Sequence, residues 1–307
     1  MARAVGRRGF RVIEAYSRIV RLGEGLAATG RLSEPAMVRT IDALRICAQR
    51  VASRRIAGAR YVATEACRRA QNCTEFLERV RAITGIAIEI ISSDEEARLV
   101  VGGCASLLDR RKPRALVFDI GGGSTELVWV TVPSDPAAPP AIEGSISIPQ
   151  GVVTFADRYG GREVPATTYR AIVEEMRGSL AAFDERFAIG ERIRAGEVQM
   201  IGSSGTVTIL SALYLNLPRY IRARVDGTAL DFASIARVTH RIVSMAYVDR
   251  AAHPCIGHER ADLVLAGCAI LEAICALWPV GQLAVADRGI REGILMNLVA
   301  ASDAQRP

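Results

Sequence analysis

The sequence has no run of about 18 apolar residues, so it contains no candidate membrane-spanning helix. Its N-terminus, MARAVGRRGFRV, has no apolar core of the kind found in secretory signal peptides. Aromatic residues make up only 5% of the 307 residues, and the chain has neither a zinc-finger pattern nor an aromatic RNA-binding signature. These absences predict a cytoplasmic protein that neither enters a membrane nor recognises a specific nucleic acid.

The seven cysteines include no CxxC pair, and together with the three histidines they form no zinc-binding pattern. An odd number of cysteines scattered through apolar segments is typical of reduced, buried thiols. The sequence therefore predicts neither a disulfide framework nor a zinc site.

Lysine occurs once, at Lys112, so arginine supplies almost all of the 39 basic side chains. Arginine binds phosphate groups in a bidentate manner, and a net charge of +6 favours polyanionic ligands. A GC-rich coding bias produces the same enrichment without any function. The arginine content therefore supports a phosphate-rich ligand only in combination with a motif.

Apolar periodicity and capping residues indicate alternating strands and helices. The segment Phe10–Leu22 is predicted to form one extended segment or two short strands, and Ser33 is predicted to cap a helix. One helix is expected over Thr74–Thr84, ended by Gly85, and another from Ser93 through Leu108. This alternation predicts an α/β fold, and the length is sufficient for two domains with separate cores.

The most informative segment is ALVFDIGGGSTELVWV, residues 115–130, in which a glycine turn connects two apolar strands. Glycines allow successive backbone N–H groups to face an anion, and neighbouring hydroxyl groups add donors. The segment therefore predicts a phosphate-binding turn, and a hairpin turn without a ligand is the alternative. The turn residues are Gly121, Gly122, Gly123, Ser124 and Thr125.

Two carboxylates flank this turn. Asp119 ends the first strand, where it is placed to hold Mg²⁺ or Mn²⁺ against a phosphate, because hard cations prefer carboxylate and phosphate oxygens. Glu126 begins the returning strand and is in reach of the same space. The pair therefore predicts a divalent cation beside the phosphate-binding turn.

A second glycine-rich turn follows a predicted strand and precedes a predicted helix. In that geometry, backbone amides and the helix N-terminus point at one place, which suits an anion. An ordinary packing turn built from small residues is the alternative. The residues of this second predicted phosphate-binding turn are Gly202, Ser203, Ser204, Gly205 and Thr206.

Seven segments in a fixed order resemble the exopolyphosphatase and guanosine pentaphosphate phosphohydrolase (Ppx/GppA) phosphatase family of the actin-like ATPase superfamily. They are SRIVRLGEGL, ATEACRRA, ISSDEEARL, FDIGGGSTEL, IGSSGT, ERADLVLAG and DRGIREGIL. The resemblance implies two actin-like (ribonuclease H-like) domains with a cleft between them. They would cover residues 1–111 and 112–289, with the last helix, 290–307, packed back on the first.

The resemblance also implies a metal-assisted hydrolase that releases the terminal phosphate of inorganic polyphosphate or guanosine pentaphosphate. Glu96 resembles the general base that activates water, Asp119 the metal-binding carboxylate, and Glu126 a second carboxylate for water or metal. A homodimer formed through the second domain is a further expectation. The residues expected to line the cleft as well are Thr64, Glu65, Arg68 and Arg69. A salt-bridged start of a surface helix is the alternative explanation for these four residues.

Glu96 has a second interpretation, because Ser93-x-x-Glu96 also matches a capping box in which the glutamate bonds the backbone of the cap residue. In that interpretation Glu96 stabilises the start of a helix and has no catalytic role. The sequence alone favours this interpretation, whereas the resemblance favours the catalytic one.

The chain departs from the family at its N-terminus. Family members usually begin with a strand, a D-x-G-[ST]-N turn and a returning strand, and MARAVGRRGF does not match this pattern. The sequence therefore predicts a first domain that is truncated at its N-terminus, without its own phosphate loop. This departure keeps two further functions open: a catalytically impaired regulatory protein that binds polyphosphate or guanosine penta- or tetraphosphate, and an actin-like ATPase or sugar kinase.

Overall fold

The structure is a computed structural model that describes residues 1–5, 9–135 and 138–304. The chain divides into two compact units. Unit 1 consists of Met1–Gly103 and Ile290–Pro307, and unit 2 of Cys104–Gly289. The first segment of unit 1 ends at Gly103, whereas the sequence predicts a boundary after residue 111.

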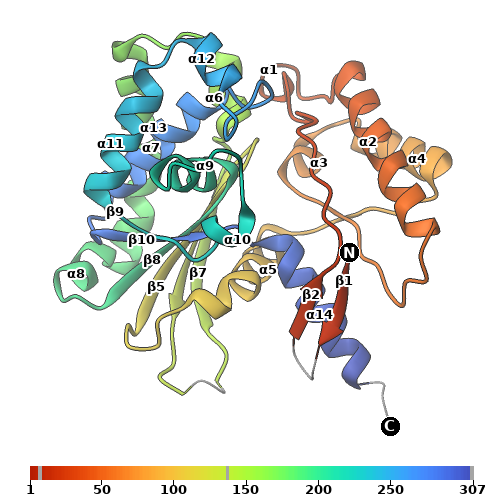
Figure 1. Cartoon of the computed structure of the whole chain (residues 1–307), viewed down its shortest axis with the longest axis horizontal. Helices are drawn as coiled ribbons and strands as arrows, with labels where there is room; N and C mark the ends of the chain where they lie inside the picture. The colour runs from red at the N-terminus through yellow and green to blue at the C-terminus, as the bar shows by residue number, and fades with distance from the viewer. Residues whose placement is uncertain (6–8, 136–137, 305–307) are drawn as a thin grey trace. The chain divides into compact units, whose positions relative to one another are not determined.

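Unit 2 is built on a mixed six-stranded sheet with the strand order β7-β6-β5-β8-β10-β9 (Figure 1). Strands β5, β6 and β7 form an antiparallel meander, and β8 runs parallel to both β5 and β10. The central strands are almost continuously buried, as expected for a sheet covered on both faces. The strands are β5 (Arg114–Ile120), β6 (Thr125–Thr131), β7 (Ala141–Ile148), β8 (Val198–Ser203), β9 (Ala229–Asp231) and β10 (Gln282–Ala286).

The helices of unit 2 pack a single large core with this sheet. Helix α13 is the most apolar of the packed helices and is buried along most of its length. It begins at Val264, directly after turns formed by residues 258–263. The helices are α6 (Val152–Tyr159), α7 (Ala166–Phe187), α8 (Ile189–Arg194), α9 (Gly205–Tyr214), α10 (Arg222–Val225), α11 (Phe232–Ser244), α12 (Tyr247–Ala252) and α13 (Val264–Leu277).

Unit 1 is mainly helical, and its described strands form two separate two-stranded sheets. Strand β1 pairs with β2 antiparallel, and β3 pairs with β4 parallel. The strands are β1 (Ala2–Val5), β2 (Gly9–Val12), β3 (Val62–Ala63) and β4 (Glu89–Ile90). The helices are α1 (Leu26–Thr29), α2 (Glu34–Ala52), α3 (Glu65–Arg69), α4 (Cys73–Thr84), α5 (Ser93–Cys104) and α14 (Ile290–Ala304).

The expected α/β class is confirmed, with differences at element ends. The Ser33 side chain accepts a hydrogen bond from a backbone N–H of α2, and Gly85 ends α4 with φ 70°, as predicted. The segment Phe10–Leu22, predicted to be one extended segment or two short strands, belongs to β2 only as far as Val12. The N–H groups of Ile13 and Glu14 donate to the Met1 carbonyl, and residues 13–21 belong to no helix or strand. Helix α5 ends at Cys104 and a 3-10 turn replaces its predicted last residues.

None of the helices in the described ranges is long and apolar enough to cross a membrane.

All seven cysteines are free thiols, and burial raises the pKa of Cys268 to about 12. A thiol with so high a pKa remains protonated and unreactive at neutral pH.

Candidate active site

The strand ends of unit 2 bring the predicted phosphate and metal residues to one edge of the sheet. Asp119, at the end of β5, is the direct partner of Ser203 at the end of β8. Ser203 in turn pairs with Ala286 of β10, which precedes the Asp287 turn. Both predicted glycine turns therefore leave neighbouring parallel strands at the same edge, the position at which open α/β sheets bind ligands.

The first glycine turn closes the hairpin between β5 and β6. The N–H of Gly121 donates to the Ser124 carbonyl at 2.9 Å. Asp119 and Glu126 are direct cross-strand partners, so their side chains project from the same face of the sheet. The hairpin thus holds two carboxylates beside the glycine turn.

Glu126 is buried, with 4% exposure, and hydroxyl groups position it. Ser124 donates to Glu126 Oε1 at 2.5 Å. Ser147, the cross-strand partner of Glu126 on β7, donates to the same oxygen at 2.9 Å. The Thr125 hydroxyl donates to the Gln150 carbonyl at 2.7 Å. The sequence predicts that the hydroxyls of Ser124 and Thr125 donate to phosphate. In the structure they donate instead to Glu126 and to the Gln150 carbonyl.

The carbonyl groups of the turn face the start of α6. Val152 N–H donates to the Gly121 carbonyl at 3.0 Å, and Val153 N–H donates to the Gly122 carbonyl at 2.8 Å. In a trans peptide the N–H is opposite the carbonyl, so the N–H groups of Gly122 and Gly123 point away from α6. Two successive N–H groups on one side of a turn form a site for an anion.

The second glycine turn has the predicted strand–turn–helix geometry between β8 and α9. Ser204 Oγ accepts from Val207 N–H at 3.0 Å as the N-cap of α9, which leaves its own proton for another acceptor. The Ser203 hydroxyl donates to the Arg288 carbonyl at 2.9 Å. Close packing explains Gly202, since a Cβ there would lie 2.5 Å from the Phe118 ring.

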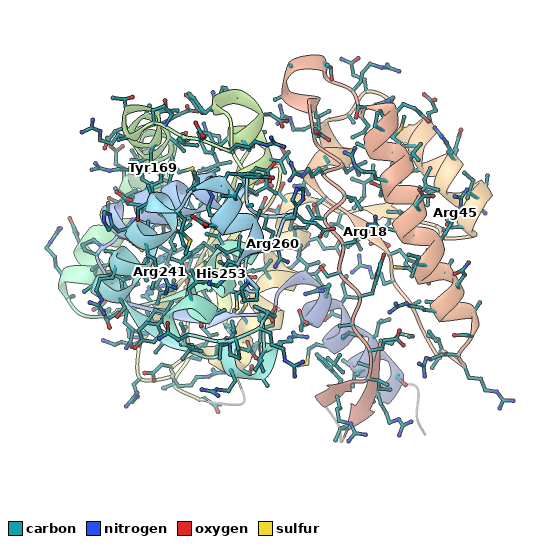
Figure 2. All side chains as sticks on the ribbon, turned by 45° about the horizontal axis from the view of Figure 1, so that its top comes forward. Arg18, Arg45, Tyr169, Arg241, His253 and Arg260 are labelled. Atoms are coloured by element: carbon teal, nitrogen blue, oxygen red, sulfur yellow. The ribbon has the colours of Figure 1, made fainter. Side chains whose placement is uncertain are left out.

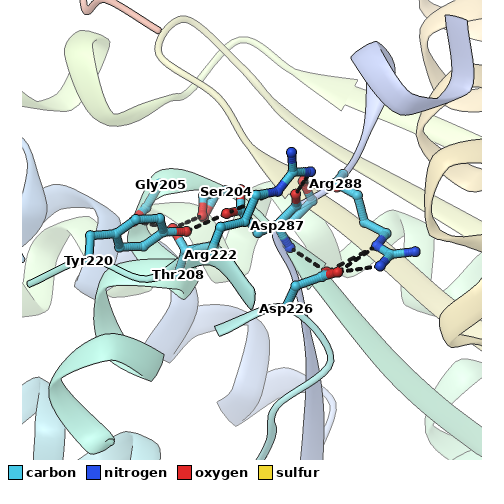
Figure 3. A network of polar contacts seen from close by, with 9 residues as sticks. Ser204, Gly205, Thr208, Tyr220, Arg222, Asp226, Asp287 and Arg288 are labelled. Carbon is cyan, nitrogen blue, oxygen red and sulfur yellow. Dashed lines mark hydrogen bonds and ion pairs between the residues drawn. The ribbon is translucent and has the colours of Figure 1, made fainter. Parts of the chain in front are cut away.

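A polar network supports the edge next to the second turn (Figure 3). The Tyr220 hydroxyl donates to Asp287 Oδ2 at 2.5 Å, and Arg222 donates to the Asp287 carbonyl. Arg288 forms a bidentate pair with Asp226, with Nε at 3.0 and 2.9 Å from its two oxygens. Burial, together with the bond to Asp287, raises the pKa of Tyr220, so the hydroxyl remains a donor. The network fixes the Asp287 turn at the end of β10.

In unit 1 the predicted general base lies in a cluster of polar residues. Glu96, on α5, is 3% exposed, and Arg68 donates to its Oε2 at 2.7 Å. Arg68 also contacts Glu65 at 3.2 Å, and Thr64 is among the groups that lower the pKa of Glu96. The structure thus brings together Glu96 and three of the four predicted cleft residues, Thr64, Glu65 and Arg68. Arg69 lies beside them, 3.8 Å from Glu65.

The electrostatics of Glu96 are a balance of opposed effects. Burial raises the pKa of Glu96 above its usual value, and the hydrogen bond and charge of Arg68 oppose that shift. The charge of Glu65 raises it further. A carboxyl group with a raised pKa is a stronger base once ionised, which suits proton abstraction.

The capping-box interpretation of Glu96 is wrong in this structure. Ser92 caps α5, because Ser92 Oγ accepts from Glu95 N–H at 3.2 Å, so Ser93 already belongs to the helix. The Glu96 carboxylate accepts from Arg68. The preceding residue, Glu95, forms an ion pair with Arg60 at 2.5 Å.

The carboxylates of the hairpin fit a divalent cation. Asp119 and Glu126 offer the oxygen ligands that Mg²⁺ prefers, from directly opposite strand positions. In the part of the chain that the structure describes, no three His, Cys, Asp or Glu side chains gather as a complete metal cage. Mg²⁺ that binds together with a phosphate commonly takes one or two protein carboxylates and completes its shell with phosphate oxygens and water.

Several residues of the site are not predicted from the sequence. Ser147, Tyr220 and Asp226 come from segments without a recognisable motif, and cross-strand register or tertiary contacts bring them to the site. Arg260 lies in the ERADLVLAG segment, and its Nε is 3.8 Å from where a Cβ of Gly205 would lie, at the N-terminus of α9. Its position in one of the seven family-like segments is the sequence feature that could have identified Arg260.

Several known proteins have similar sequences and folds. A model of the Ppx/GppA phosphatase family matches residues 2–301. Exopolyphosphatase 2 of Mycobacterium tuberculosis is 29% identical over 300 residues, covering 93% of this chain and 89% of that protein. The crystal structure of the Aquifex aeolicus member of the Ppx/GppA family has 27% sequence identity to this chain and a TM-score of 0.74. The match covers 96% of this chain and 91% of the Aquifex aeolicus chain. An exopolyphosphatase of Cytophaga hutchinsonii, at 21% identity, shares the fold with a TM-score of 0.83 over 98% of this chain and 93% of its own.

Proposed function

Because the chain belongs to the Ppx/GppA phosphatase family, whose model matches residues 2–301, we propose that it releases the terminal phosphate of inorganic polyphosphate, of guanosine pentaphosphate, or of both. The glycine hairpin of unit 2 is the observation that carries the proposal. Its two outward N–H groups and its two flanking carboxylates combine an anion site with a cation site.

In this proposal the residues of unit 2 bind and orient the phosphate. The N–H groups of Gly122 and Gly123 donate to its oxygens, and Ser204 supplies a further hydroxyl at the N-terminus of α9. Asp119 and Glu126 would hold Mg²⁺ or Mn²⁺. Such a cation neutralises charge on phosphate oxygens, which is a main requirement of phosphoryl transfer.

Glu96 takes the proton of the attacking water in the proposed mechanism. Arg68 keeps the buried carboxylate ionised and in a fixed rotamer through the bond to Oε2. A fixed, partly desolvated carboxylate is both oriented toward its proton and basic enough to accept it.

The test is phosphate release by Glu96→Gln beside a matched variant, Glu95→Gln. General base catalysis contributes about 10² to 10⁴-fold, so Glu96→Gln is expected to lose roughly a thousandfold in kcat. Glu95 lies on the same turn of α5 as Glu96 and pairs with Arg60. Substitution of Glu95 is therefore expected to retain turnover within about twofold. Full phosphate release by Glu96→Gln would contradict the mechanism.

The same assay separates the two rival functions. Tight binding of polyphosphate or guanosine tetraphosphate without release would identify a regulatory binding protein. Preferential hydrolysis of ATP, or phosphate transfer from it, would identify an ATPase or a kinase.

A further inference from the structure

The segment Ser147–Thr154 contacts the glycine hairpin along its length, although no motif marks it. It contributes Ser147 to Glu126, the Gln150 carbonyl to Thr125, and two backbone N–H groups to the carbonyls of the turn. The contacts involve the Glu126 carboxylate, the Thr125 hydroxyl and the backbone carbonyls of the turn. Residues outside the hairpin therefore help to determine the conformation of the turn.

Gly151 is the point of closest approach. A Cβ at Gly151 would lie 2.6 Å from the Gly121 carbonyl oxygen and closer still to that of Gly122. Its φ of −121° and ψ of −178° are extended values that any residue adopts, so conformation does not require glycine here. Glycine is required because the backbone of the turn occupies the place of the side chain.

Thr154 holds the segment in this position. Its Oγ1 accepts from Gly151 N–H at 2.6 Å and lies 3.5 Å from the Gly123 carbonyl. Thr154 lies in the first turn of α6, and the first N–H groups of this helix would otherwise lack partners. The carbonyls of Gly121 and Gly122 satisfy two of these donors. The start of the helix and the turn thus complete each other's hydrogen bonds.

We propose that Gly151 is a positioning residue. Without a side chain at this position, the carbonyls of Gly121 and Gly122 reach the first N–H groups of α6, and the N–H groups of Gly122 and Gly123 are thereby oriented toward phosphate. The inference rests on the proposed function for its catalytic consequence. The orientation itself is a property of the turn and is measured without turnover.

The principal variant is Gly151→Ala, with Gly178→Ala as its control. A Cβ at Gly178, within α7, meets no atom within 4 Å, so this variant adds the same methyl group without displacing anything. A displacement of reacting groups by about 1 Å costs roughly 100-fold, so we expect Gly151→Ala to lose about that factor in kcat. Gly178→Ala is expected to retain full activity and thermal stability.

A second pair of variants tests the position without adding volume. Thr154→Val removes the hydroxyl that accepts from Gly151 N–H, and about a tenfold loss of kcat is expected from one missing hydrogen bond. Thr154→Ser restores the hydroxyl and is expected to restore kcat. Equal loss in both Thr154 variants would assign the effect to packing and overturn the inference.

The direct readout is the amide spectrum of protein labelled with ¹⁵N-glycine, titrated with sodium tripolyphosphate. In the unmodified chain and in Gly178→Ala, the Gly122 and Gly123 resonances are expected to shift on titration. In Gly151→Ala both are expected to have moved before titration and to respond weakly. A tripolyphosphate response in Gly151→Ala equal to that of the unmodified chain would overturn the inference.

The two failures are distinguishable. If the unmodified chain releases no phosphate but its Gly122 and Gly123 resonances respond to tripolyphosphate, the hydrolase proposal fails and the positioning role stands on the spectra. If neither resonance responds in the unmodified chain, the turn does not bind phosphate and the positioning role is refuted.

Discussion

The two units hold their polar residues by different means. In unit 2 a six-stranded sheet sets them by register, since Asp119, Ser203 and Ala286 are aligned on neighbouring strands. In unit 1 the described strands form only two short pairs, and Glu96 is placed by burial and by its bond to Arg68. The site of unit 2 therefore depends on backbone pairing, and that of unit 1 on a few side chains.

The units also differ in charge. Residues 1–103 contain 18 arginines against 11 aspartates and glutamates, whereas residues 104–289 are slightly acidic. Many of these arginines form ion pairs within unit 1, such as Arg60 with Glu89 and Glu95. Unit 1 thus carries the surplus that attracts a polyanion, while unit 2 carries the carboxylates that suit a cation.

The largest effect after the loss of Glu96 is expected from Asp119→Asn in unit 2. Removing a carboxylate that holds the proposed cation is expected to lower kcat/KM about 100-fold and to raise the Mg²⁺ concentration needed for half-maximal activity. Glu143→Gln on β7 removes a half-exposed carboxylate bound to Thr131 and serves as the control. An unchanged Mg²⁺ requirement in Asp119→Asn would exclude Asp119 as a metal ligand.

In unit 1, Arg68→Met is expected to lower kcat at pH 7 roughly tenfold, the effect of one lost charge-assisted hydrogen bond of about 1.5 kcal/mol. Arg68 holds down the pKa of Glu96, which burial raises, so its loss raises that pKa further. A base acts in its ionised form, so the acidic limb of the pH profile of kcat/KM is expected to move to higher pH. Arg69→Met leaves the bond to Glu96 intact and should keep the original limb. An unmoved limb in Arg68→Met would exclude the coupling.

Two helix caps offer a matched comparison between the units. Ser33 caps α2 in unit 1 and Ser204 caps α9 in unit 2. Each serine-to-alanine change is expected to cost about 1 kcal/mol of stability, measured by urea unfolding. Only Ser204→Ala is expected to reduce turnover as well, by about fivefold, because only that cap lies in the proposed phosphate site. Equal turnover in the two variants would remove Ser204 from the site.

The smallest expected effect concerns salt. The surplus of arginine in unit 1, which includes Arg18, should attract a long polyanion more than a short one (Figure 2). Raising the ionic strength should therefore increase KM for long-chain polyphosphate about threefold, and that for tripolyphosphate less. Steady-state kinetics at two salt concentrations measure the difference. The same salt dependence for both substrates would assign no role to this charge.

The sequence predicts the α/β class and the family correctly, and both are confirmed by the fold and by the family match. Glycine turns between apolar strands are local signals, so the hairpin around Gly121–Gly123 and the turn before α9 are recognisable without a structure. The geometry agrees at the hairpin because the length and residues of the turn set the register of its two strands.

Other features are not readable locally. Ser147, Gly151 and Asp226 acquire their contacts through tertiary approach, which leaves no fixed spacing in the sequence. The extended segment predicted after Val12 has apolar residues typical of a strand but finds no partner strand. Pairing is a long-range property, and propensity alone does not supply it. The roles of the site residues stay predictions.

The central claim is tested most directly by measuring phosphate release by the unmodified chain, with Mg²⁺, on long-chain polyphosphate, guanosine pentaphosphate and ATP. The account predicts release from polyphosphate, from guanosine pentaphosphate or from both, with little from ATP and none once Mg²⁺ is chelated. Release from ATP alone, or from none of the three, would contradict it.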